Sequence, residues 1–337
     1  MDQSVNHVFS VLDGGHSLWE RFSSREHFMT TITINEVGMR DGLQSLQAIM
    51  PTFAKRQWID AAYAAGVRHM EVASFVPAKL LPQMADAREI VAHALTYPDL
   101  VVTVLAPNLR GATDALESGA HRIVAPVSVS AAHSLANVRR TPLEMVDEFA
   151  RMCRLRTEMG AHNVQMIAGM SVAFGCTRQG DVPLSDLLEL SRRVLEAGCD
   201  LISLGDTTGY ANPGQVATVI QAVRAIAGDK LGAAHFHDTR GLALANSLVA
   251  VQQGITELDS SLAGLGGCPF APGASGNTVT EDLVFMLQSM GYETGIDLPA
   301  LIDSIEVLRA GLPGERLYGC IARAGLPLNY ARVACHA

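Results

Sequence analysis

The chain has 337 residues, of which 48% are hydrophobic and 18% are charged, so it can bury a large core. Its formal net charge is -9, and no basic run exceeds two residues, which argues against a nucleic-acid groove. No apolar run approaches the ~18 residues that cross a bilayer, so no membrane partner is expected. Six scattered cysteines without a CxxC pair are typical of reduced thiols in the cytoplasm.

Residues 1–28 form a polar leader without an apolar core. They hold two arginines against four acidic residues. This pattern is typical of neither a secretory signal nor an organelle transit peptide. We therefore expect a cytoplasmic protein with a dispensable N-terminal extension over these 28 residues.

From Thr31 onward, strand-like and helix-like stretches alternate without a long linker. Short apolar runs rich in β-branched residues predict strands that begin near Thr31, His69, Val101, Arg122, Val164, Leu201, Leu231 and Glu257. Each is followed by a predicted helix, and these helices cover 51–66, 84–95, 109–119, 141–160, 183–199, 213–228, 241–254 and 278–291.

Eight successive strand-then-helix units predict an α/β fold, a (β/α)₈ TIM barrel over residues 29–295. An open, doubly wound sheet is the alternative. Residues 296–337 predict one more helix, at 297–310, and a C-terminal tail packed on the barrel. Active sites of TIM barrels lie at the carboxyl ends of the strands, so chemistry is sought there.

Four side chains with metal-binding atoms fall at or just past predicted strand ends. Asp41 follows the first strand, His235 and His237 share one face of the seventh, and Asn277 ends the Gly-rich loop after the eighth. One carboxylate, two imidazoles and one amide oxygen suit a six-coordinate Mg²⁺ or Mn²⁺ better than a closed zinc site. Each residue alone has an ordinary structural explanation, but their joint placement favours a cation site.

Three more polar residues lie at strand ends. Arg40, beside Asp41 in a Gly-flanked turn, either pairs a structural acid or holds a developing oxyanion. Glu71 lies in an otherwise apolar strand and is costly to bury unpaired, which makes Arg40 its obvious partner. Asp206 is either a turn acid or a functional group.

Two cysteines also follow strands. Cys268 lies in Gly-Leu-Gly-Gly-Cys-Pro, a sequence that presents a thiol rather than packing it. Cys176 follows the fifth strand and stays ambiguous.

Several colinear motifs between Thr31 and Gly291 can be compared with known families. They are Glu36-Val-Gly-Met-Arg-Asp-Gly-Leu-Gln44, Glu71-Val-Ala-Ser-Phe-Val, Leu80-Leu-Pro-Gln-Met-Ala-Asp86, Ile202-Ser-Leu-Gly-Asp-Thr207, His235-Phe-His-Asp-Thr239 and Ala263-Gly-Leu-Gly-Gly-Cys-Pro-Phe-Ala-Pro-Gly-Ala-Ser-Gly-Asn277. Together they resemble the 3-hydroxy-3-methylglutaryl-CoA lyase family. The Arg-Asp-Gly and His-x-His motifs alone are shared with isopropylmalate synthase-like condensing enzymes, whereas the Gly-rich loop with Cys268 is specific to the lyases.

The resemblance implies a divalent cation, Mg²⁺ or Mn²⁺, on Asp41, His235, His237 and Asn277. It implies that Arg40 stabilises an enolate oxygen, that Glu71 orients Arg40, that His235 takes part in proton transfer and that Cys268 delivers or relays a proton. The catalytic residues are thus expected to be Arg40, Asp41, Glu71, His235 and Cys268. The expected substrate contacts are Gln44, Asp206, Thr207 and Arg240.

The chain departs from the family's usual pattern at several positions, namely Met39, Ser45-Leu46, Thr177-Arg178-Gln179, Phe236 and Arg240. Arg240 stands where Tyr is usual, and it either pairs an acid such as Asp238 or reaches the substrate's carboxylate or a CoA phosphate. The departures bear on the identity of the substrate's acyl group more than on the type of reaction. The expected substrate is 3-hydroxy-3-methylglutaryl-CoA or a close branched 3-hydroxyacyl-CoA such as citramalyl-CoA.

No clear motif for the CoA nucleotide is present in the sequence. Arg110, Arg139 and Arg140 are either contacts of the CoA phosphates or solvated charges at helix ends. Two other functions stay open: a condensing transferase, which would not need Cys268, and a non-catalytic barrel that binds acyl-CoA or metal. A homo-oligomer, dimeric or higher, is expected.

Overall fold

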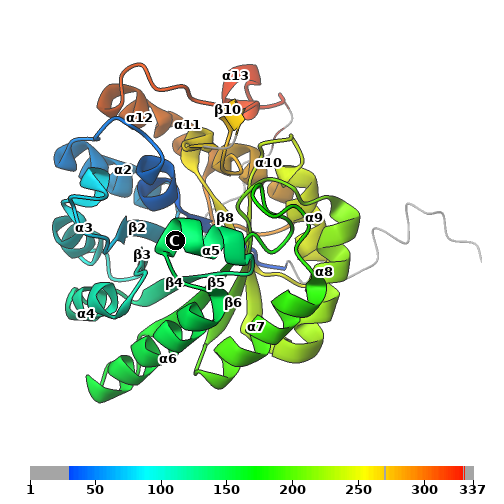
Figure 1. Ribbon diagram of the computed structural model, residues 1–337. Coiled ribbons are helices and arrows are strands. Elements are labelled where there is room, and N and C mark those ends of the chain that lie inside the picture. Colours follow the sequence, from blue (N-terminus) through cyan, green and yellow to red (C-terminus); the bar gives the residue numbers. More distant parts are fainter. Residues whose placement is uncertain (1–29, 269–270, 329, 331–337) are drawn as a thin grey trace, which may run out of the picture. The chain divides into compact units, whose positions relative to one another are not determined.

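Eight parallel strands close into a barrel in sequence order, and β1 pairs with both β2 and β8 (Figure 1). The strands are β1 (Thr33–Glu36), β2 (His69–Ser74), β3 (Val101–Leu105), β4 (Arg122–Ser128), β5 (Gln165–Ser171), β6 (Leu201–Asp206), β7 (Leu231–Phe236) and β8 (Glu257–Ser260). This computed structural model describes residues 30–268, 271–328 and 330, with the backbone alone at 267–268 and 271–275. The predicted barrel is confirmed, and its closure excludes the open sheet.

Helices follow the strands and surround them (Figure 1). They are α2 (Thr52–Ala64), α3 (Ala87–Ala94), α4 (Leu109–Glu117), α5 (Ala131–Val138), α6 (Pro142–Glu158), α7 (Leu184–Glu196), α8 (Pro213–Ala227), α9 (Ala243–Gln252) and α10 (Thr280–Ser289). Some begin at clear sequence signals: Thr141 and Glu144 form a capping box at α6, and the Asn212 side chain caps α8. Among the described residues, none of the helices is long and apolar enough to cross a membrane.

The sequence did not predict three features of the chain. Helix α5 interrupts the connection from β4 to α6, and a hairpin of β9 (Gly267–Cys268) and β10 (Ala271–Ser275) follows β8. The expected helix at 297–310 is two helices, α11 (Leu298–Asp303) and α12 (Ile305–Gly311). The expected extension over residues 1–28 lies outside the described residues.

The C-terminal segment is attached to the barrel through α10. The Asp282 carboxylate accepts hydrogen bonds from the backbone N–H groups of Cys320 and Ile321, at the start of α13 (Ile321–Ala324). The Tyr318 N–H donates to the Ala263 carbonyl at 2.8 Å. These bonds place the segment against the loop that leads into β9.

Charged side chains close the amino end of the barrel. Arg122 on β4 donates to Glu257 Oε1 on β8 at 2.8 Å and to Gln165 Oε1 on β5 at 2.7 Å. His69 Nδ1 lies 3.2 Å from Arg122 Nη1, and burial next to that guanidinium lowers the pKa of His69 to about 4. Each charge here has its counter-charge, so this end of the barrel is structural.

Candidate metal centre and active site

A π-helical turn, Gly38–Gly42, positions Arg40 and Asp41 directly after β1. The Val37 carbonyl accepts the N–H groups of Arg40 at 3.0 Å and Asp41 at 2.7 Å. A side chain at Gly38 would meet Glu36 Oε1 at 2.6 Å, so only glycine fits there. Such turns are frequent at functional sites, and this one directs two adjacent charged side chains into the barrel mouth.

Asp41, His235 and His237 bring three metal-binding atoms together, all within 4.8 Å of one another. Asp41 Oδ2 lies 3.8 Å from His235 Nε2 and 3.6 Å from His237 Nε2. The backbone of His237 forms a bridge with that of Asn277, whose buried side chain donates to the Leu265 carbonyl at 3.2 Å. One carboxylate oxygen and two imidazole nitrogens form a donor set that fits a divalent cation.

The guanidinium of Arg40 joins two carboxylates. It contacts Asp41 Oδ1 and donates to Glu71 Oε2 at 2.7 Å. Burial alone would raise the pKa of Asp41, but Arg40 and the two histidines hold that pKa well below its ordinary value. Burial raises the pKa of Glu71, and Arg40 opposes the shift. The site therefore keeps one fixed positive charge beside the cation ligands.

A second carboxylate contacts His235 from behind. Asp259 Oδ2 on β8 lies 3.1 Å from His235 Nδ1, and Asp259 Oδ1 accepts a hydrogen bond from the Asn35 amide at 2.8 Å. A carboxylate in this position orients an imidazole so that its other nitrogen faces the ligand site. The sequence reasoning missed Asp259 and Asn35, although Glu257 and Asp259 alternate along β8 as two inward-facing acids would.

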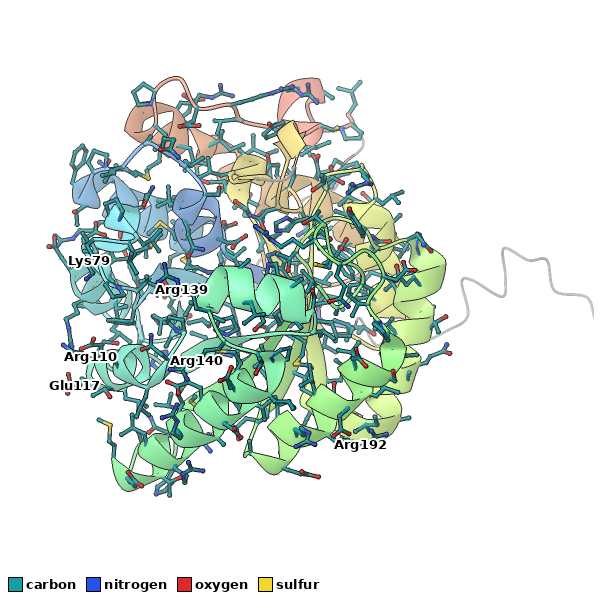
Figure 2. All side chains as sticks on the ribbon, viewed as in Figure 1. Lys79, Arg110, Glu117, Arg139, Arg140 and Arg192 are labelled. Atoms are coloured by element: carbon teal, nitrogen blue, oxygen red, sulfur yellow. The ribbon has the colours of Figure 1, made fainter. Side chains whose placement is uncertain are left out.

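One large cavity of about 960 Å³ opens above this centre. It reaches from Asp41, His235 and His237 past an apolar wall to Arg139 and Arg140, which lie at the junction of α5 and α6 (Figure 2). That wall is formed by Val76, Pro77, Leu80, Leu81 and Pro107. Of the expected substrate contacts, Gln44 and Thr207 line the cavity.

His133 on α5 also lines the cavity and was not singled out from the sequence. It is buried, and its Nδ1 lies 2.9 Å from Ser128 Oγ. Burial and the nearby Arg178 lower the pKa of His133, which favours the neutral imidazole. A single histidine within an unrecognised helix carries no pattern that would reveal this placement.

Two other expected substrate contacts lie outside the cavity lining. Asp206 accepts hydrogen bonds from the N–H groups of Tyr210 and Ala211, which is the role of a turn acid. Arg240 donates to the carbonyls of Thr208 and Gly209 at 3.0 and 2.9 Å, and its guanidinium lies 4.5 Å from the centre of the Tyr210 ring. Both residues therefore brace the loop after β6.

Among the positions that depart from the family pattern, Ser45 lines the cavity. Met39 is buried, and Phe236 is fully buried against Phe174, with 5.8 Å between the ring centres. The side chain of Gln179 accepts a hydrogen bond from Ser130 at 2.9 Å. Apart from Ser45, the departing positions lie outside the cavity lining.

The backbone of Cys268 lies in β9, while its side chain is outside the described residues. The turn before β9 is held by two buried glutamates. Glu36 Oε1 accepts from the Leu262 N–H at 3.0 Å, and Glu281 Oε2 accepts from the Ala263 N–H at 3.0 Å. Burial raises the pKa of Glu36 to about 7 and that of Glu281 to about 8. Cys176, by contrast, is fully buried.

Comparison with known proteins gives one consistent family. A family model described as HMGL-like matches residues 31–308. The hydroxymethylglutaryl-CoA lyase of Bacillus subtilis is 39% identical over 273 residues, covering 81% of this chain and 90% of that protein. The mitochondrial hydroxymethylglutaryl-CoA lyase of Mus musculus is 40% identical over 274 residues, covering 81% and 83%.

A solved structure agrees with these relatives. It is an HMG-CoA lyase from Acinetobacter baumannii in complex with coenzyme A and 3-methylmalate. The TM-score is 0.82 at 36% sequence identity, and the match covers 90% of this chain and 98% of that one.

Proposed function

Because this chain belongs to the HMGL-like family, whose relatives are hydroxymethylglutaryl-CoA lyases, we propose that it cleaves 3-hydroxy-3-methylglutaryl-CoA or a close branched 3-hydroxyacyl-CoA. The enzyme is a carbon–carbon lyase, and its products would be acetyl-CoA and a keto acid. The observation that carries the proposal is the convergence of Asp41, His235 and His237 beside Arg40 at one large cavity.

Asp41, His235 and His237, together with Asn277, are the residues that would hold a divalent cation, Mg²⁺ or Mn²⁺. The donor set supports this choice, because carboxylate, amide and imidazole ligands that leave positions open are typical of such sites. When bound, the cation supplies a Lewis acid that lowers the pKa of the substrate's hydroxyl group.

Arg40 is proposed to hold the enolate oxygen that forms on the thioester when the bond breaks. Its guanidinium is buried and fixed by Glu71 and Asp41, so it needs little reorganisation during the reaction. Burial opposes the positive charge, but the two carboxylates outweigh burial and raise the pKa of Arg40. The guanidinium thus keeps its positive charge at neutral pH.

His235 is better suited to cation binding than to proton transfer. Its Nδ1 faces Asp259 at 3.1 Å, and its Nε2 faces Asp41 in the ligand group. With a cation in place, neither nitrogen is available to accept a proton from the substrate. We therefore assign His235 to cation binding. Cys268 stays the proposed acid that protonates the enolate. It lies on the β9–β10 hairpin, and Glu36 and Glu281 hold the turn before β9.

The outer part of the cavity is proposed to bind the CoA arm. Arg139 and Arg140 line it, whereas Arg110 lies outside the lining and 3.6 Å from Asp114. Arg140 also pairs with Glu148 at 2.8 Å, so Arg139 is the better candidate for a phosphate contact. The apolar wall between these arginines and the cation ligands suits the pantetheine chain.

A cleavage assay tests the proposal directly. Purified protein is treated with EDTA and assayed with 3-hydroxy-3-methylglutaryl-CoA and citramalyl-CoA, with and without Mg²⁺ or Mn²⁺. We expect no turnover without metal and recovery on its addition; full activity in metal-free protein would contradict the cation site. The Cys268→Ala variant should lose roughly 10²-fold in kcat, the usual scale for a proton-transfer group. Bond formation from acetyl-CoA and a 2-oxo acid, unaffected by this variant, would instead identify a condensing enzyme.

A cytoplasmic location and a homo-oligomeric state also remain proposals. The excess of acidic over basic residues in 1–28 supports the first, and fractionation tests it; light scattering of the purified protein tests the second. We further propose that the barrel unit does not need residues 1–28. A chain starting at Met29 should melt within a few degrees of the full-length protein.

A further inference from the structure

Small residues occupy inward positions where a barrel normally carries bulky ones. TIM-barrel interiors are filled mainly by Val, Ile and Leu. In this protein Gly169 on β5, Ser203 and Gly205 on β6, and Ala233 on β7 all line the cavity instead. The cavity therefore continues downward from the mouth into the barrel.

The strand register places this inner chamber next to the cation ligands. Gly205 pairs with His235, Ser203 pairs with Ala233, and Gly169 pairs with Ser203. These four small residues thus form one patch on adjacent strands. In the proposed complex, the carbon that bears the hydroxyl group would face this patch, because Gly205 lies beside His235.

The backbone does not require glycine at either position. Neither Gly169 nor Gly205 has a positive φ. A Cβ at Gly205 would meet its nearest neighbour at 3.4 Å, an ordinary contact, and a Cβ at Gly169 would meet Val124 at 3.1 Å, a tight but adjustable one. The missing side chains therefore leave space that the fold itself does not need.

The charges around the chamber restrict what can enter. Glu257 and Asp259 contribute carboxylates to its lining, and Arg122 on the barrel floor already pairs with Glu257. These two carboxylates would repel a carboxylate of the substrate that entered the chamber. An uncharged group gains from the apolar surfaces of Val124 and Ile167.

We propose that this chamber receives an uncharged alkyl branch, longer than methyl, on C3 of the 3-hydroxyacyl-CoA substrate. The proposal rests on the lyase function argued above and names its substrate class: 3-hydroxyacyl-CoA esters with an extended branch, preferred over the 3-methyl compound. The substrate's free carboxylate then lies on the mouth side, away from Glu257 and Asp259.

The experiment uses two matched ligand series with methyl, ethyl, propyl and butyl branches. Cleavage is measured with 3-hydroxy-3-alkylglutaryl-CoA esters and Mg²⁺. Binding is measured by calorimetry with the 3-alkylglutaryl-CoA esters, which lack the hydroxyl group and cannot be cleaved. In the wild-type protein we expect affinity to rise by about fourfold per added methylene, the equivalent of ~0.8 kcal/mol, until the chamber is full.

Two substitutions fill the chamber: Ala233→Val and Ser203→Val. Each should lower kcat/KM for the butyl substrate by about 10-fold or more, while the methyl substrate changes by less than about threefold. Ala245→Leu, at an exposed position of α9, is the size control and should leave the preference unchanged. Melting curves verify that each variant folds. If Ala233→Val does not fold, Ser203→Val alone provides the test.

The outcomes separate this proposal from the lyase function. Cleavage of the methyl substrate, with weaker binding of every longer analogue, would overturn the chamber and leave the lyase function standing. Tighter binding of longer analogues without any cleavage would keep the chamber and overturn the lyase function. An equal loss on all branch lengths in both filled variants would also overturn the chamber, because it would indicate a general packing defect.

Discussion

The two ends of the barrel both bury charge, and they differ in how that charge is satisfied. At the amino end, Arg122 binds Glu257, and His69 beside them is neutral. At the carboxyl end, Asp41 binds Arg40 through one oxygen, while its other oxygen faces His235 and His237 across 3.6 to 3.8 Å.

The difference lies in what each group of charges can bind. At the amino end, each charge is matched by a neighbouring counter-charge, so that end is structural. At the carboxyl end, one carboxylate and two imidazoles converge within 4.8 Å of one another, which is a donor set that fits a divalent cation. Buried charge by itself therefore does not mark a functional site; a converging set of metal-binding donors does.

The largest effect on stability is expected at the amino end. Glu257→Gln leaves Arg122 buried without its counter-charge and should cost about 3–5 kcal/mol of unfolding free energy. Denaturant titration measures this loss. The affinity for Mn²⁺ should not change, because Glu257 does not contact the cation ligands. A matching loss of Mn²⁺ affinity would mean that the two ends are coupled and would weaken the comparison.

Asp41→Asn should show the opposite pattern. The amide keeps the shape of the side chain but removes the charge that the cation needs. Mn²⁺ affinity, measured by calorimetry or by electron paramagnetic resonance of the free ion, should fall by about 100-fold or more, beyond the effect of losing an outer partner. The metal-free protein should lose less stability than Glu257→Gln does, because the buried Arg40 keeps Glu71 as a counter-charge. Unchanged Mn²⁺ binding would remove Asp41 from the ligand set.

Asp259→Asn tests whether the carboxylate that contacts His235 Nδ1 contributes to cation binding. Loss of the carboxylate behind His235 should reduce Mn²⁺ affinity by about 10–100-fold. Glu257→Gln is the matched control, since it lies two residues away on the same strand and also faces the interior. Equal affinities in Asp259→Asn and the wild type would show that Asn35 and packing alone orient the imidazole.

The last prediction concerns Glu281, which belongs to neither end. Burial raises its pKa to about 8, from an ordinary value of 4.5. The folded state thus holds a proton that the unfolded chain loses above pH 4.5, so this group's contribution to stability is lost as pH rises from about 4.5 to 8. In Glu281→Gln, the melting temperature relative to wild type should increase between pH 5 and pH 8.5.

An exposed glutamate gives the control for this pH series. Glu306→Gln, at a side chain that is 76% exposed, should follow the wild-type curve. If Glu281→Gln also follows that curve, Glu281 is ionised in the folded protein and the turn before β9 is held by a charged group.

The sequence alone was enough to predict the barrel and the catalytic face. Strand starts such as His69, Arg122 and Leu231 were predicted at the residue where the strand begins, because buried parallel strands and amphipathic helices have distinct local patterns. Asp41, His235 and His237 could be grouped without coordinates, since every strand end of this fold meets at one face. Arg40 and Glu71 could be paired because an unpaired buried charge is costly.

Other features depended on contacts between residues far apart in the sequence. Asp259 reaches His235 only because β7 and β8 pair in one register. Arg240 and Asp206 hydrogen-bond to backbone groups of the loop after β6, which no local pattern reveals, and their role as substrate contacts stays a prediction. The inner chamber needs four small residues from three strands to meet. Local patterns determine which elements form, whereas register and closure of the barrel decide which side chains share a site and where space is left between them.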